Sequence, residues 1–524
     1  MIPRVRACGR PTFASLVGLA SLLAVLPQTA SAQVSAATVP AGFVDELIAS
    51  GLGLPVGIAF LPDGRLLAVE QKSAHIDLVR MGPPATVDSV GFVPSVNIIG
   101  TERGLLGIAV DPEWPVRPYV YTHSTDVSSN VRISRFKAAG ALTDPAGLIG
   151  IDPASRYDLV NDIPDNADNH NGGTVRFGTD GMLYVSLGED AFPSAAQDTS
   201  TLRGVILRLD VSRLPDGPGS AARALVTPPG NPFGSTGGLN ARLLWEYGLR
   251  NPFRLQVDPM TGTLLIADVG ESTWEEVDLA PVGGLDFGWP HYEGDMVYSS
   301  VALTGSPTFP IYVINHTTGA KAVISAGIYR HPAGGTRAFP AEYEGDAFIS
   351  DYYAGFMRRL HQTGVAWDLA APVTGQPSST DWAQGLVNVS DYAIGPEGGI
   401  WYCREYVTDF AHSGQIRRIV STASSSVDNA SHPVAFARPY PLPSTGSVQF
   451  DWSIAHAARV SLAILDVRGR LVRAVAVPRA LPVGHHHAIW DGLDSYGRAV
   501  QPGIYFARLE VDGTSLEQRV LIVR

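Results

Sequence analysis

Cysteine is almost absent from this chain, which has two in 524 residues. Cys8 lies in an N-terminal segment that we expect to be removed, so only Cys403 remains. A single cysteine cannot close an intramolecular disulfide, and stability in an oxidising compartment must therefore come from packing or a bound metal. The same shortage excludes an oxidoreductase of the dithiol type.

Clusters of lysine and arginine with interleaved aromatic residues are also missing, and the formal net charge is -12. Both features argue against nucleic acid and other polyanions as partners. No segment after the N-terminal region is continuously apolar over about 18 residues, so we expect no membrane span and a soluble product.

The N-terminus has the pattern of a secretory signal peptide. Three arginines lie among the first ten residues, followed by the apolar run Phe13–Leu26 and the small residues Ala30-Ser31-Ala32. This order is typical of a cleaved leader. We predict a signal peptide over 1–32 and a secreted, periplasmic or cell-surface protein.

A short unit recurs along the next four hundred residues: an apolar pair, a turn of the Pro-Asp-Gly kind and an alternating strand. The first unit is Ile58–Glu70, with Pro62-Asp63-Gly64 at its turn. Five further units follow at Ile108–Tyr121, Val175–Val185, Leu255–Asp268, Gly327–Ser350 and Ala393–Tyr402. None has a helical apolar period, and repeated small β-units predict an all-β, six-bladed β-propeller. Another all-β fold with similar turns is the alternative.

Composition changes near residue 420. We assign 33–420 to the propeller, the Ser-rich stretch 421–435 to a linker and 436–524 to a small immunoglobulin-like β-sandwich, because alternating apolar and polar strands recur in that last region.

The segment Asn169-His170-Asn171-Gly172-Gly173 is the strongest candidate for chemistry. Histidine can accept a proton near neutral pH, and the glycines beside it let a flat ligand approach the backbone. The alternative is a loop histidine that is bonded to its neighbours.

Four motifs together resemble the soluble pyrroloquinoline quinone (PQQ) dependent aldose dehydrogenases, the glucose/sorbosone dehydrogenase family. They are Gly104-Leu105-Leu106-Gly107, the His170 segment, Trp245–Pro252 and Gly283–Pro290, in the family's order. The resemblance covers about residues 43–420.

The resemblance implies oxidation of an aldose at its anomeric carbon to a lactone, with PQQ and calcium held at one face of the propeller. His170 would take the hydroxyl proton, and Glu189 would orient it. Arg250 and Asn251 match residues that bind the cofactor, and Arg250 would also stabilise charge that develops during the reaction. Glu102 matches a polar side chain beside the substrate and cofactor.

Calcium would be bound partly by main-chain oxygens at Gly270 and Glu271, since oxygen ligands suit this hard ion. The substrate would be a small sugar, and the residues do not identify the electron acceptor.

The chain also departs from the family. A cofactor-binding lysine of the fifth blade has no counterpart in 350–355, and two arginines of the sixth have none in 388–391. Loss of these cations should weaken binding of an anionic cofactor. The sequence of the fifth-blade segment 345–352 is more similar to the hedgehog-interacting-protein-like branch of the superfamily. Two alternatives therefore stay open: a propeller that binds carbohydrate or protein without redox chemistry, and a calcium-dependent lactonase.

The C-terminal region resembles the FlgD-type immunoglobulin-like modules of exported bacterial proteins, through Asp466–Val472, Trp490-Asp491-Gly492 and Pro502–Phe506. The resemblance implies contact with secretion machinery or the cell surface.

Overall fold

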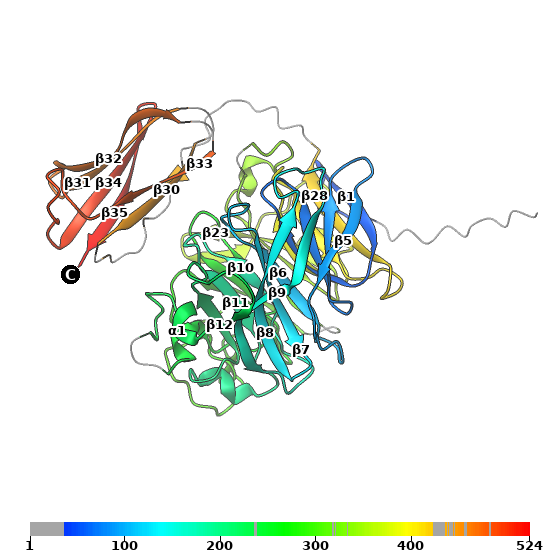
Figure 1. Ribbon diagram of the computed structural model, residues 1–524. Coiled ribbons are helices and arrows are strands. Elements are labelled where there is room, and N and C mark those ends of the chain that lie inside the picture. Colours follow the sequence, from blue (N-terminus) through cyan, green and yellow to red (C-terminus); the bar gives the residue numbers. More distant parts are fainter. Residues whose placement is uncertain are drawn as a thin grey trace, which may run out of the picture. The chain divides into compact units, whose positions relative to one another are not determined.

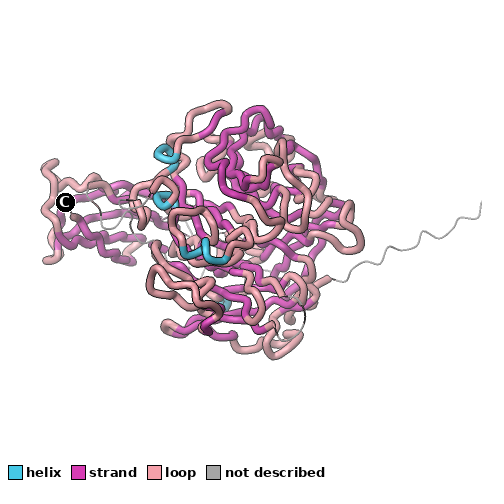
Figure 2. The backbone as a smooth tube through the Cα atoms, turned by 90° about the horizontal axis from the view of Figure 1, so that it is seen from below, coloured by secondary structure: helices cyan, strands magenta, loops and turns pink. Residues whose placement is uncertain are grey.

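The computed structural model describes residues 36–523 except 235–237, 317–318, 320, 333, 423–434, 437–438, 440–443, 445, 455–457 and 482–483. The expected signal peptide and most of the expected linker lie outside the described residues. Strands dominate the described part (Figure 2). Its short helices are η1 (Pro193–Gln197), α1 (Arg223–Val226), η2 (Ala241–Leu243) and η3 (Ala341–Tyr343).

Six sheets, each built around four antiparallel strands, form the blades of a β-propeller. Blade 1 contains β2 (Pro55–Phe60), β3 (Leu66–Glu70), β4 (His75–Arg80) and β5 (Thr86–Phe92). Blade 2 contains β6 (Leu105–Val110), β7 (Tyr119–Asp126), β8 (Asn130–Gly140), β9 (Ile149–Pro164) and the short β13 (Gly219–Ser220). Blade 3 contains β10 (Val175–Phe177), β11 (Leu183–Leu187), β12 (Val205–Leu209) and β14 (Leu244–Tyr247).

Blade 4 contains β15 (Arg254–Val257), β16 (Leu264–Asp268), β17 (Trp274–Ala280) and β20 (Tyr312–Asn315). A hairpin of β18 (Tyr292–Glu293) and β19 (Met296–Val297) lies between its last two strands in sequence. Blade 5 contains β21 (Val323–Ile328), β22 (Ala347–Asp351), β23 (Phe356–Thr363), β24 (Ala366–Leu369) and β25 (Ala383–Gln384). Blade 6 contains β26 (Val389–Ile394), β27 (Ile400–Arg404), β28 (Gly414–Ser421) and β1 (Phe43–Leu52).

Blade 6 closes the ring, because its outer strand β1 comes from the start of the chain and pairs antiparallel with β28 (Figure 1). The inner strands contact one another in succession, and the inner strand of blade 6, β26, contacts β2 of blade 1. The predicted six-bladed propeller is confirmed. Its apolar side chains lie in clusters between neighbouring blades, such as Leu67, Leu105 and Phe136 between blades 1 and 2.

The recurring Asp-Gly turns join the first two strands of their blades as predicted. Gly64 follows Asp63 between β2 and β3 with φ of +88°, and Gly181 follows Asp180 between β10 and β11 with φ of +74°. This backbone region is costly for residues with a Cβ, which explains the glycine at each turn.

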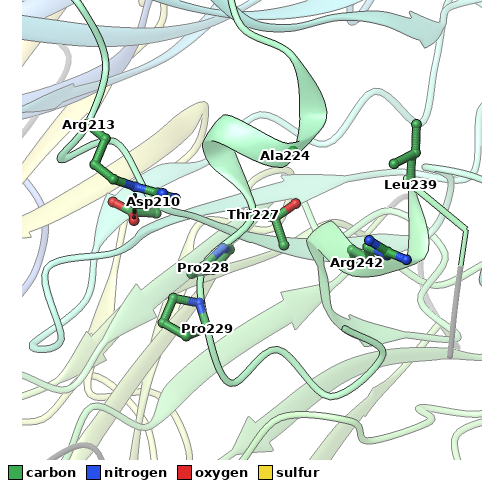
Figure 3. A pocket seen from close by; sticks show the side chains of 8 residues that line it. All are labelled: Asp210, Arg213, Ala224, Thr227, Pro228, Pro229, Leu239 and Arg242. Carbon is green, nitrogen blue, oxygen red and sulfur yellow. Dashed lines mark ion pairs between the residues drawn. The ribbon is translucent and has the colours of Figure 1, made fainter. Parts of the chain in front are cut away.

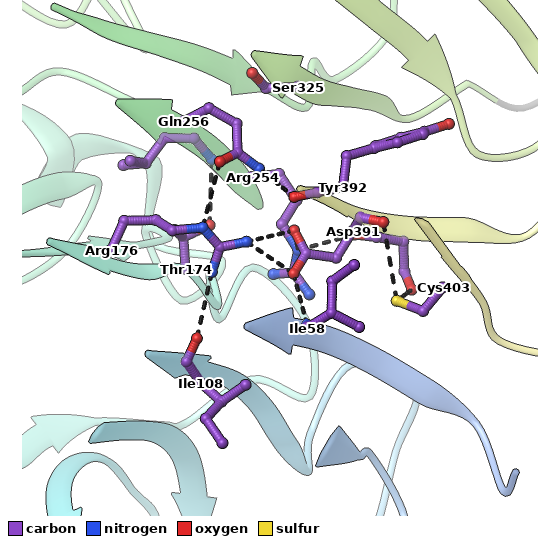
Figure 4. Close-up of polar contacts among 12 residues, drawn as sticks. Ile58, Ile108, Thr174, Arg176, Arg254, Gln256, Ser325, Asp391, Tyr392 and Cys403 are labelled. Atoms are coloured by element: carbon purple, nitrogen blue, oxygen red, sulfur yellow. Dashed lines mark hydrogen bonds and ion pairs between the residues drawn. The ribbon is translucent and has the colours of Figure 1, made fainter. Parts of the chain in front are cut away.

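Polar bonds join the inner strands across the ring (Figure 4). Arg176 of blade 3 donates to both carboxylate oxygens of Asp391 of blade 6, at 2.7 and 2.8 Å. Asp391 also accepts the backbone N–H of Ile58 in blade 1 at 2.9 Å. Arg254 of blade 4 donates to the carbonyl oxygens of Ser390 at 2.8 Å and Leu106 at 3.0 Å. These bonds fix the relative positions of five blades around the axis.

Loops of two kinds share one face of the ring because successive strands of a blade are antiparallel. They are the loops between the second and third strands and those that lead to the next blade. The expected site residues all lie on loops of these kinds, at 93–104, 165–174, 188–204, 248–253 and 269–273. We call this face the site face.

The C-terminal region forms two antiparallel sheets that share a hydrophobic core. One sheet contains β29 (Ala435–Phe436), β30 (Val448–Ile454) and β33 (Gly484–Trp490). The other contains β31 (Ala458–Asp466), β32 (Leu471–Leu481), β34 (Gly503–Val511) and β35 (Thr514–Ile522). Phe450, Trp452 and Leu462 are among the buried residues between them. The predicted small β-sandwich is confirmed.

Candidate active site

His170 lies on the loop that leads from blade 2 to blade 3, in a left-handed conformation with φ of +59°. This loop packs closely on the segment that follows β11. A Cβ at Gly188 would lie 2.1 Å from the His170 carbonyl oxygen, and a Cβ at Gly172 would lie 2.5 Å from that of Ser186. Only glycine allows this approach, so the two glycines fix where the imidazole is presented.

The His170 imidazole pairs with the Glu189 carboxylate through Nδ1. Glu189 is completely buried, whereas the His170 side chain is 11% exposed. Nε2 of His170 has no hydrogen-bond partner among the described residues. When Nδ1 carries the proton and donates it in the hydrogen bond to Glu189, the free lone pair of the ring lies on Nε2. The structure thus brings together the predicted base and the residue predicted to orient it.

Glu102 lies beside the same histidine. Its Oε2 accepts the backbone N–H of His170 at 2.7 Å and the Nδ2 amide of Asn251 at 3.3 Å. The Oδ1 atom of Asn251 in turn accepts the backbone N–H of Gly172 at 3.1 Å. Three loops from different blades therefore converge on one polar network.

Arg250 and Asn251 are held by a carboxylate that the sequence did not single out. Asp268, at the end of β16, accepts the backbone N–H of Arg250 at 2.8 Å and that of Asn251 at 2.7 Å. Burial raises the pKa of Asp268 to about 7, although both N–H groups act in the opposite direction. Asp268 fixes the turn that positions both predicted cofactor residues.

The Arg250 guanidinium lies against the loop after β16. It donates to the Val269 carbonyl oxygen at 2.9 Å, pairs with the Glu271 carboxylate and lies over the Trp289 ring at 5.6 Å from its centroid. Tyr298 stacks on Trp289 with the ring centroids 5.0 Å apart. The buried Nε of Arg250 has no partner among the described residues. Arg250 Nε is thus a donor without an acceptor in the described part of the chain.

The loop predicted to bind calcium is held by hydrogen bonds to one carboxylate. Glu293 of the β18–β19 hairpin accepts the backbone N–H groups of Glu271, Ser272, Thr273 and Trp274 through one oxygen, at 2.8 to 3.3 Å. Burial opposes ionisation of Glu293, but these bonds outweigh it and lower its pKa. A Cβ at Gly270 would lie 1.7 Å from the Trp274 carbonyl oxygen, so the tight turn requires glycine there.

Within the described residues, no group of three or more His, Cys, Asp or Glu side chains is arranged to hold a metal ion. Binding of calcium by main-chain oxygens at Gly270 and Glu271 stays a prediction. Cys403 is buried, and burial raises the pKa of its thiol to about 12.

The positions where the family's cations are missing contain neutral or acidic residues. Tyr352 donates its hydroxyl to Glu405 at 2.7 Å, and Tyr353 is 53% exposed on the site face. Burial raises the pKa of Glu405 to about 7. Lys72 is a cation on this face, and its ammonium donates to the carbonyl oxygens of Gly100 at 2.9 Å and of Arg103.

A surface hollow of about 610 Å³ lies away from these residues, between the segment after β12 and the helices α1 and η2 (Figure 3). Asp210, Thr227 and Arg242 line it. The end of β12 that it adjoins is opposite the end at the site face, so it is separate from the His170 site.

The fold and the site together define a six-bladed propeller whose loops present a histidine and carboxylate pair on one face. Residues 52–402 match the model of the Glucose / Sorbosone dehydrogenase family. The chain belongs to this family.

Curated relatives match parts of the chain. The HIPL2 protein of Arabidopsis thaliana is 33% identical over 248 residues, which are 43% of this chain and 34% of that protein. Aldose sugar dehydrogenase YliI of Escherichia coli is 26% identical over 266 residues, which are 50% of this chain and 66% of the relative. The chain thus spans between a third and two thirds of these relatives.

Among solved structures, the PQQ-bound aldose sugar dehydrogenase of Streptomyces coelicolor has a TM-score of 0.53 at 24% identity. The comparison covers 73% of this chain and 99% of that one. At this identity the likeness shows the fold alone. No helix among the described residues is long and apolar enough to cross a membrane.

Proposed function

We propose that this protein oxidises an aldose sugar at its anomeric carbon to a lactone, with His170 as the general base. The observation that carries the proposal is the His170–Glu189 pair, in which a buried carboxylate engages Nδ1. Nε2 can then accept the hydroxyl proton of the sugar, and the Glu189 charge stabilises the imidazolium that forms. Membership of the Glucose / Sorbosone dehydrogenase family supports this chemistry.

The donors around Arg250 fit an anionic quinone such as PQQ. Arg250 has a buried Nε without a partner among the described residues, and Asn251 lies beside it on the turn held by Asp268. When bound, PQQ would accept the two electrons and the hydrogen that leave the anomeric carbon. Arg250 and Asn251 would bind and orient it, with Glu102 holding Asn251 and the His170 backbone in place.

Calcium belongs to the same proposal. Gly270 and Glu271 would contribute main-chain oxygen ligands. The backbone N–H groups of their loop donate to the Glu293 carboxylate, which holds the loop in place. We also propose that residues 1–32 direct export and that the C-terminal sandwich serves secretion or surface attachment. The N-terminal residue of the protein recovered outside the cytoplasm, expected to be Gln33, tests the export step.

Reconstitution tests the function. Purified protein is loaded with PQQ and calcium, and reduction of an artificial dye is followed with a panel of aldoses. We expect activity that falls on the order of 100-fold or more in His170→Ala, because the general base is lost. His361→Ala is the matched control, since this histidine is 58% exposed and bonds Asp346 outside the site. Unchanged turnover in His170→Ala would exclude the assigned base.

A second candidate function is sugar or protein binding without redox chemistry. The Tyr352-Tyr353 pair on the fifth blade and the similarity to HIPL2 favour it. Binding of a sugar to the apoprotein, together with no dye reduction under any loading condition, would support this second function. Hydrolysis of a lactone that depends on calcium and not on PQQ would instead support a lactonase.

A further inference from the structure

Arg404, at the end of β27 nearest the site face, is a buried cation that forms no ion pair with the described residues. Arg404 is 2% exposed, and its Nη2 atom donates to the Gly385 carbonyl oxygen. Nε and Nη1 are buried and have no hydrogen-bond partner among the described residues. A buried guanidinium without a counter-ion is strongly unfavourable, so its presence calls for an explanation.

Two hydroxyl groups lie with Arg404 between blades 5 and 6. Tyr392 Oη and Ser350 Oγ are buried and likewise form no hydrogen bond of good geometry with the described residues. Burial raises the pKa of Tyr392, whereas Ser350 and the Arg404 charge act in the opposite direction, as expected for close neighbours. We call Arg404, Ser350 and Tyr392 the Arg404 cluster.

The carboxylate of Asp45, which bonds the neighbouring Tyr402, is already engaged. It accepts the Tyr402 hydroxyl at 2.9 Å and pairs with Arg417 at 3.0 Å. The Arg404 cluster therefore combines three donor side chains, one guanidinium and two hydroxyl groups, and the guanidinium carries one positive charge. Such a set suits an anion.

The cluster lies next to both segments where the family's cofactor-binding cations are absent. Arg404 is the cross-strand partner of Val389, inside the segment 388–391. The backbone N–H of Asn388 donates to the Tyr352 carbonyl oxygen at 2.8 Å, which joins that segment to 350–355. Arg404, a buried cation that forms no ion pair with the described residues, thus adjoins the positions that lost their cations.

We propose that Arg404, with Ser350 and Tyr392, supplies the positive charge that the anionic cofactor meets on the side of blades 5 and 6, in place of the missing cations. This inference rests on the proposed function. Because Arg404 is buried, solvent screens its charge only weakly, and the charge can attract the anionic cofactor from inside the protein. The charge also polarises the hydroxyl groups of Ser350 and Tyr392. Arg404 is in this sense a positioning residue.

Affinity for PQQ tests the proposal without turnover. PQQ is titrated into the full chain with calcium and no sugar, and its absorbance is followed for wild type, Arg404→Met, Arg404→Lys and Arg359→Met. Arg359 is the matched control: it is a half-buried arginine of blade 5, but it pairs with Asp346 and lies over Tyr343. We expect about tenfold weaker binding in Arg404→Met, and affinities within about threefold of wild type in the other two.

Equal PQQ affinity in wild type and Arg404→Met, or an equal loss in Arg359→Met, would overturn the proposal. A second measurement follows thermal unfolding with added oxalate, a small dianion. We expect oxalate to raise the unfolding temperature of wild type and Arg404→Lys more than that of Arg404→Met. If wild type responds to oxalate but does not bind PQQ, the assigned cofactor is wrong and the anion site stands. If it responds to neither, the anion site is wrong.

Discussion

Replacement of Asp268 by alanine should loosen the turn that carries Arg250 and Asn251. The Asp268 carboxylate is 4% exposed and accepts both backbone N–H groups of this turn, at 2.8 and 2.7 Å. Each buried N–H that loses its acceptor costs about 1–3 kcal/mol, so the two together should lower the free energy of unfolding by about 2–6 kcal/mol. Cofactor affinity should fall as well, because both donors move.

Asp278→Ala is the control for this prediction. Asp278 lies on the neighbouring strand β17, opposite Ile266, is completely buried and has no hydrogen-bond partner among the described residues. Its replacement leaves a cavity of the same size without depriving an N–H group of its acceptor. Denaturant unfolding followed by tryptophan fluorescence, together with a PQQ titration, compares the variants. Equal unfolding free energies in Asp268→Ala and Asp278→Ala would refute the role given to the two hydrogen bonds.

Three further predictions follow from the site and the domain organisation. Glu189→Gln should lower sugar oxidation at least about tenfold in the dye assay, because glutamine cannot stabilise an imidazolium at His170 by its charge; full activity would contradict the pairing. Burial raises the pKa values of Asp268 and Glu405 to about 7, so the folded chain keeps protons that the unfolded chain releases from about pH 4. The free energy of unfolding should therefore fall as pH rises from about 4 to about 7, and a denaturation series that shows a rise over this window would exclude the linkage. Truncation after Val420 should leave a folded, active propeller whose location is altered, because the sandwich has its own core; an insoluble or inactive product would show a shared essential interface.

Much of the fold could be predicted from the sequence because it depends on local patterns. The turn at Pro62-Asp63-Gly64 lies between β2 and β3 as expected, and the turn at Asp180-Gly181, inside the predicted unit Val175–Val185, lies between β10 and β11. The region 436–524 contains strands as its alternating pattern predicts, such as β30, Val448–Ile454. A strand alternates with a period of two residues, and a glycine turn depends on its own φ, so neither needs distant contacts.

The glycines around His170 also marked the site in the sequence, because a close backbone approach requires them at fixed neighbouring positions. The carboxylates that complete the site carried no such mark. Asp268 follows an apolar strand like any strand end, and Glu293 lies in an insertion without a repeat pattern.

The network itself was decided by the tertiary structure. Glu102, His170 and Asn251 belong to loops of different blades and meet only when the ring closes and brings those loops to one face. The role proposed for Arg404 likewise depends on its cross-strand pairing with Val389 and on its burial, which the sequence alone does not show. The sequence determined the strands, the turns and the histidine, whose geometry is local. Charged and hydrogen-bonding residues that are far apart in the chain came together only through the packing of the blades.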